Sequence, residues 1–131
     1  MVSSWIQGNN GSQFTGSNSR TGKTVAVTGD GNTFVYSSSF GTDGDLLVYE
    51  YANGNWSQKG TTITTNNDST AIKGGLLGYE KIDISDDANV VIGQIKSSDF
   101  TGLEVFEWDG TDYTSAITFK ADPNYEGDSG N

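Results

Sequence analysis

The chain has 131 residues, the length of one ordinary domain, and it lacks both Cys and His. Without those residues, thiolate nucleophiles and thiolate or imidazole metal sites are excluded. A formal net charge of −10, from 17 acidic and 7 basic residues, argues against binding to nucleic acids and to anionic membrane surfaces.

The first half of the chain predicts four short strands separated by turns. Residues 24–28 alternate valine with smaller or polar residues, which is the period of a strand whose valines, Val25 and Val27, face inward. The run GDGN at residues 29–32 predicts a tight hairpin turn, because Gly, Asp and Asn tolerate the positive φ that such turns need. The other strands expected here are at residues 33–38, 46–51 and 56–60.

The second half of the chain repeats the first at a spacing of 57 positions. The segment LLVYEY at residues 46–51 returns as LEVFEW at 103–108, and VAVTGDGN at 25–32 returns as IDISDDAN at 82–89. Four further strands are therefore predicted, at residues 81–85, 90–95, 103–108 and 113–119. No segment shows capped apolar periodicity of 3.6 residues, so no long helix is expected.

These repeats predict an all-β fold of two tandem four-stranded antiparallel units. The first unit, with an N-terminal strand, spans residues 1–63, the second spans 64–120, and an acidic, Gly-rich tail follows at 121–131. The tail is expected to be loosely ordered unless it docks on the rest of the chain. The first residues lack the basic and apolar regions of a secretory signal peptide, so none is predicted. No apolar run approaches the roughly 20 residues of a membrane-spanning helix, so no membrane insertion is expected.

The order of the motifs resembles the FG-GAP-type repeats of β-propellers. WSQKG at residues 56–60 matches a W-x-Q-x-G opening, and TGDG at 28–31 stands where those repeats carry an S-x-D-G hairpin. VYEY at 48–51 and VFEW at 105–108 match their V-Y-E-W strand. The resemblance covers the chain up to about residue 119, and it implies that each unit is a propeller blade of four antiparallel strands.

Carboxylates recur at matching positions of the two units. The calcium loop D-x-D-x-D-G of integrin-like FG-GAP blades does not occur, and DGD at residues 43–45 has no counterpart in the second unit. Asp30 and Asp87 occupy equivalent hairpin positions, where each either joins a cation-binding ring or caps its own turn, and capping is the expectation. Glu50 and Glu107 face the same way on separate sheets, which argues against the facing carboxylates of a glycosidase. No metal site and no cofactor are predicted.

Five aromatic residues form the candidate binding set: Trp5, Tyr51, Trp56, Trp108 and Tyr113. Trp5, Trp56 and Tyr113 occupy corresponding places at the edges of the units. Rings of this kind either stack on sugars, as exposed aromatic residues do in lectins, or pack between neighbouring sheets. Packing is the expectation, because only 33% of the residues are apolar and large rings supply much of the area that such a chain can bury.

No enzyme activity is expected, because the chain also lacks a G-x-S-x-G motif and a phosphate-binding loop. Propellers close with about 4–8 blades, and stacked repeats need about three units to bury a continuous core. The sequence therefore predicts a structural or assembly protein that self-associates into a ring, filament or coat, such as a virion or appendage component outside the cell. The alternative is a lectin-like or adhesive module that recognises carbohydrate or a protein surface.

Overall fold

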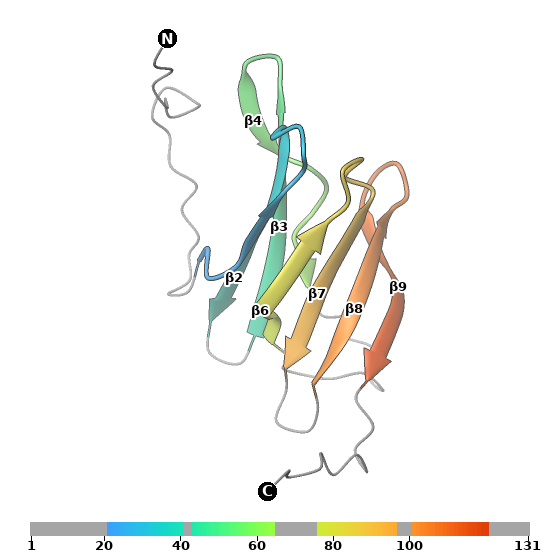
Figure 1. The fold of residues 1–131 in the computed structure, drawn as a ribbon. Coiled ribbons are helices and arrows are strands. Elements are labelled where there is room, and N and C mark those ends of the chain that lie inside the picture. The colour runs from blue at the N-terminus through green and yellow to red at the C-terminus, as the bar shows by residue number, and fades with distance from the viewer. Residues whose placement is uncertain (1–20, 41–42, 65–75, 97–100, 121–131) are drawn as a thin grey trace, which may run out of the picture.

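The computed structural model describes residues 21–40, 43–64, 76–96 and 101–120 of the chain (Figure 1). Within these ranges the chain forms nine β-strands, and none of the described segments is a helix long and apolar enough to cross a membrane. The strands are β1 (Val25–Val27), β2 (Thr33–Phe40), β3 (Asp43–Ala52), β4 (Asn55–Gln58), β5 (Ile63–Thr64), β6 (Leu76–Ile84), β7 (Val90–Lys96), β8 (Thr101–Trp108) and β9 (Tyr113–Lys120). The predicted all-β class with two antiparallel units is confirmed, and the segments that the structure describes contain no long helix.

The first unit is the antiparallel meander β1–β2–β3, completed along the far edge of β3 by two short strands. Strand β4 pairs with the C-terminal half of β3, where Trp56 lies opposite Tyr51, and β5 pairs with the N-terminal half, where Ile63 lies opposite Leu46. Between β4 and β5 the chain passes through Gly60, which has a φ of 72°. The strand expected at residues 56–60 therefore ends at Gln58, because a residue with this φ leaves the extended conformation, and β5, which was not expected, follows beyond Gly60.

The second unit is the antiparallel meander β6–β7–β8–β9. Its register places Val91 opposite Phe106 and Trp108 opposite Tyr113. A single parallel bridge between Gly44 and Leu76 joins β3 to β6. The predicted tail at residues 121–131 lies outside the described residues.

The β1–β2 and β6–β7 hairpin turns are built in the same way. In the first, the carboxylate of Asp30 accepts hydrogen bonds from the Thr28 hydroxyl at 2.7 Å and from the Asn32 amide nitrogen at 2.9 Å. In the second, Asp87 accepts the equivalent two hydrogen bonds at 2.6 and 3.0 Å. These bonds favour the ionised form and lower the pKa of both carboxyl groups. Each Asp therefore caps its own turn, as expected.

The hydrophobic core lies between the two units. Figure 1 shows β2 and β3 on one side and β6 to β9 fanning out on the other. The buried core residues are Val35, Leu46, Val48 and Ile63 from the first unit and Ile84, Ala88, Val91, Ile95, Phe106 and Tyr113 from the second. Because side chains alternate between the two faces of a strand, each sheet contributes one face to this core and turns the other away.

The two units present opposite faces to the core. Val48 is fully buried, whereas its counterpart Val105 is half-buried on the outer face of the second sheet and the next residue, Phe106, points inward instead. Val25 and Val27 are likewise exposed on the outer face of the first sheet. The expectation that Val25 and Val27 face inward is wrong, and the repeat, which would place Val105 inward like Val48, misleads in the same way. The two units pack with opposite faces of their sheets in contact. For each pair of equivalent residues, one therefore lies inside the core and the other lies outside.

Candidate binding surfaces

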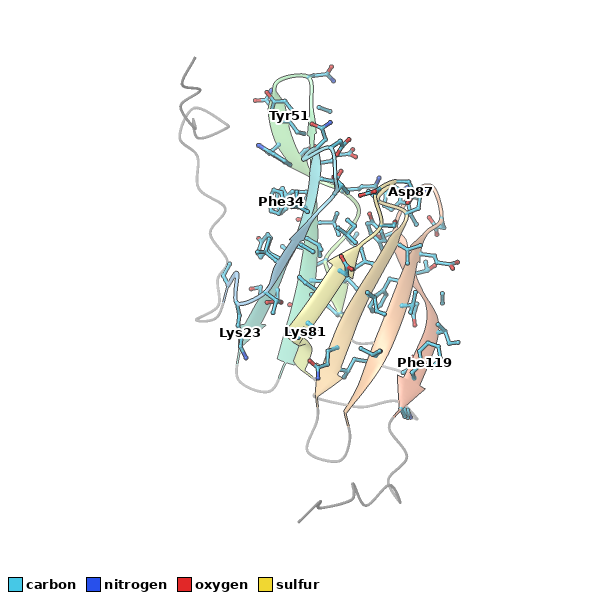
Figure 2. The ribbon with its side chains drawn as sticks, viewed as in Figure 1. Lys23, Phe34, Tyr51, Lys81, Asp87 and Phe119 are labelled. Atoms are coloured by element: carbon cyan, nitrogen blue, oxygen red, sulfur yellow. The ribbon has the colours of Figure 1, made fainter. Side chains whose placement is uncertain are left out.

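Aromatic side chains cover the outer face of the first sheet. Phe34 on β2 stacks on Tyr49 of β3 with ring centroids 5.7 Å apart, and Trp56 of β4 meets Phe34 edge-on at 5.0 Å. Tyr51 packs against Trp56 at 5.3 Å and is 43% exposed. Figure 2 shows Phe34 on the side of the first sheet that points away from β6 to β9. We call this surface the front face; its residues are Val25, Val27, Phe34, Tyr36, Leu47, Tyr49, Tyr51 and Trp56, and of these Tyr36 is buried.

Aliphatic side chains and one phenylalanine cover the outer face of the second sheet. Phe119 of β9 lies opposite Leu103 of β8, and Ile117 lies opposite Val105, which has Ile92 of β7 on its other side. Leu103, Ile117 and Phe119 are exposed, while the other two residues are half-buried. Phe119 lies on the side of the molecule opposite to Phe34 (Figure 2). We call these five residues the back face.

Trp108 and Tyr113 lie in the joint between the two units. Their ring centroids are 5.0 Å apart, and the Tyr113 hydroxyl donates a hydrogen bond of 2.6 Å to the Ala88 carbonyl oxygen. The ammonium group of Lys59, from the first unit, lies 4.8 Å from the Trp108 ring centroid. Burial, together with two nearby carboxylates, raises the pKa of Tyr113 to about 12. Both rings therefore hold the units together.

The structure divides the candidate aromatic set. Tyr51 and Trp56 lie on the front face, Trp108 and Tyr113 lie in the joint, and Trp5 lies outside the described residues. Phe34 and Tyr49 also belong to the front face, although neither is among the five predicted aromatic residues. The signal that identifies them is strand alternation, which places Phe34, Tyr49 and Trp56 on one side of neighbouring strands.

Two carboxylates of the second unit reach across the joint to backbone amides of the first. Asp86 accepts a hydrogen bond of 2.9 Å from the Gly29 amide nitrogen. Asp112 accepts one of 2.9 Å from the Thr61 amide nitrogen and one of 2.6 Å from the Thr61 hydroxyl, and these bonds lower the pKa of Asp112. These contacts fix the position of one unit against the other.

The mid-strand pair Glu50 and Glu107 does not form a facing acid pair. Glu50 is on the core-facing side of β3 and forms an ion pair of 3.6 Å with Lys59, whereas Glu107 is exposed on the outer side of β8. Among the described residues, no group of three or more acidic, His or Cys side chains is placed to hold a metal ion.

Glu104 is a buried carboxylate of the second sheet. It is 3% exposed and accepts a hydrogen bond of 2.6 Å from the Ser115 hydroxyl. Burial raises the pKa of Glu104, and the Ser115 bond offsets part of that effect. A raised pKa in the folded state means that protonated Glu104 favours folding and that this contribution is lost as the pH rises through the folded-state pKa.

We therefore expect Glu104→Gln to melt a few degrees higher than the wild type at pH 7, because the amide carries no charge to bury. The difference should vanish below the ordinary glutamate pKa of 4.5, where Glu104 is protonated in both the folded and the unfolded chain. Thermal melts by circular dichroism from pH 4 to pH 8 measure this. A constant difference across the range would show that Glu104 does not titrate as described.

Comparisons of the chain with protein-family models, with curated proteins and with solved structures find no match. The resemblance to FG-GAP repeats therefore stays a prediction. The two outer faces and the joint between the units are the features on which a function can be argued.

Proposed function

We propose that this protein is a non-enzymatic structural protein, built of propeller-like units, whose copies associate into a ring, a filament or a coat, such as part of a virion or an appendage. Its partner in this proposal is a further copy of the chain or a larger protein assembly. We propose neither binding to nucleic acid nor insertion into a membrane, and the proposed function requires no cofactor.

The observation that carries this proposal is that each sheet has a second apolar face. Among the described residues, six of the seven large hydrophobic side chains that are exposed belong to the front face or the back face. They are Val25, Val27, Tyr51, Leu103, Ile117 and Phe119. Contiguous exposed apolar surface marks an interaction site in most proteins that are otherwise polar.

The mass of the particle in solution tests the proposal. We expect light scattering at micromolar concentration to show a discrete trimer of the 13.9 kDa chain, which is a ring of six units, or very large particles if the association stays open. Because each chain carries a net charge of −10, association should strengthen as the salt concentration rises. A monomer at every protein and salt concentration would contradict self-assembly.

The alternative is a lectin-like or adhesive module, and one observation favours it. Tyr51 and Trp56 form a tilted ring pair at the end of the front face, and aromatic rings of this kind are surfaces on which sugars stack. A glycan array tests the alternative, with Tyr51→Ala as the variant that should lose the signal. An array on which the wild type binds no sugar would exclude carbohydrate from the proposal.

A further inference from the structure

The joint inside the chain shows how one unit covers another. The second unit contributes the face that holds Ile84, Val91, Phe106 and Tyr113, and the first unit contributes the face that holds Val35, Leu46, Val48 and Ile63. These are opposite faces of two sheets with the same strand order, so the joint has a direction. It is not a sandwich in which equivalent faces meet.

The front face of the first unit is the counterpart of the covered face of the second. At the spacing of 57 positions, Val27 corresponds to Ile84, Phe34 to Val91, Tyr49 to Phe106 and Trp56 to Tyr113. Val27 is 59% exposed, whereas Ile84 is 7% exposed because the first unit covers it. The front face therefore has the residue pattern of a surface that another unit covers. Within the part of the chain that the structure describes, no further unit lies on it.

The back face of the second unit is in turn the counterpart of the covered face of the first. Leu46 corresponds to Leu103 and Val48 to Val105 at the same spacing, and the strand pairing places Phe119 where Ile63 lies. Leu46 is completely buried in the joint, whereas Leu103 is 40% exposed. The two outer faces are thus the two halves of the joint already seen inside the chain.

We propose that a second copy of this chain docks head to tail, so that the front face of one copy covers the back face of the next. The inference rests on the proposed function and specifies its partner and its geometry. It continues the existing joint: each contact between chains repeats the contact between the two units of one chain. Such an interface is heterologous, and it closes into a ring or continues as a filament according to the rotation between successive units.

The joint between chains is expected to be weaker than the joint within a chain. Asp86, which binds a backbone amide across the internal joint, corresponds to Gly29, which has no side chain to make that bond. Asp112 corresponds to Asn55, which carries no charge. The carboxylates that fasten the internal joint are therefore missing from the surface that meets another chain, so association between chains should be reversible by dilution.

Blocking one face at a time tests the direction of docking. The front-blocked variant carries Val25→Arg and Val27→Arg, and the back-blocked variant carries Leu103→Arg and Phe119→Arg, all at exposed positions. Arginine makes the net charge less negative, so a loss of association would not reflect added repulsion. The control is Thr111→Arg, in an exposed turn outside both faces, which should associate like the wild type. Circular dichroism verifies that each variant is folded.

We expect each blocked variant alone to be monomeric and their equimolar mixture to form a heterodimer of twice the chain mass, seen by light scattering. Homodimers of either variant would overturn head-to-tail docking, because they require equivalent faces to meet, while self-assembly would stand. A mixture that stays monomeric would overturn it as well, since the intact front and back faces would not fit each other. If the wild type itself were monomeric, the result would contradict the proposed self-assembly and not only its head-to-tail geometry.

Cysteine cross-linking gives a second measurement with milder substitutions. The chain has no Cys, so Val27→Cys and Leu103→Cys each introduce a single thiol, one on each outer face. With a short bis-maleimide, head-to-tail docking should yield cross-linked dimers from the mixture of the two variants and little from either variant alone. Efficient cross-linking of one variant with itself would overturn the proposal.

Discussion

We expect Val48→Asp to prevent the chain from folding. Val48 is fully buried between the two sheets, where it packs with Val35, Leu46 and the residues of the second unit. An unpaired carboxylate at this site costs several kcal/mol in desolvation, which is a large part of the roughly 5–15 kcal/mol that stabilises a typical domain. Far-UV circular dichroism and thermal melting measure the loss directly.

The matched control for this variant is Val105→Asp. Val105 is the counterpart of Val48 in the repeat, but it lies half-buried on the back face, so within a single chain an aspartate carboxylate there stays in contact with water. We expect Val105→Asp to keep the β-sheet signal and a cooperative melt. If Val48→Asp melted within a degree or two of the wild type, the assignment of the two faces of β3 would be wrong.

The strands and turns of this fold could be predicted from the sequence because their signals are local. The alternation in residues 24–28 and the turn residues GDGN at 29–32 depend only on neighbouring residues. The same pattern recurs at 82–89 and supports the same prediction a second time. The choice of the inward face could not be predicted in this way. Both faces of each sheet carry apolar residues, so alternation alone does not tell whether Val25 or Ala26 meets the core.

The candidate site was only partly predictable for the same reason. Repeat symmetry groups Trp56 with Tyr113 and Tyr51 with Trp108, because equivalent residues have equivalent places in their own sheets. Packing then separates them, since the second unit has a neighbour on that face and the first does not within the described residues. Whether an aromatic residue lies in the joint or on an open surface depends on how the two units pack together. The sequence of one unit alone therefore does not predict it.

The second large effect is expected at Gly60, where Gly60→Ala should lower the free energy of unfolding by about 2–4 kcal/mol. Gly60 has a φ of 72°, a region that alanine occupies only with strain. A Cβ atom there would lie 2.7 Å from the Asp112 Oδ1 atom and 3.0 Å from the Trp108 ring. Asp112 cannot move away without losing its bonds to the Thr61 amide and hydroxyl, which fasten the joint. Denaturant unfolding followed by tryptophan fluorescence measures the change.

Gly31→Ala separates the backbone strain from the crowding at the joint. Gly31 has nearly the same φ, 73°, but a Cβ atom there would meet nothing within 4 Å. Its counterpart in the second unit is already an alanine, Ala88, with a φ of 55°, so the hairpin accepts this residue. We expect Gly31→Ala to cost at most about 1–2 kcal/mol, the strain alone. An equal loss of unfolding free energy at the two glycines would show that crowding against Asp112 and Trp108 adds no cost at position 60. Asp112 and Trp108 would then move aside more easily than the hydrogen bonds of Asp112 imply.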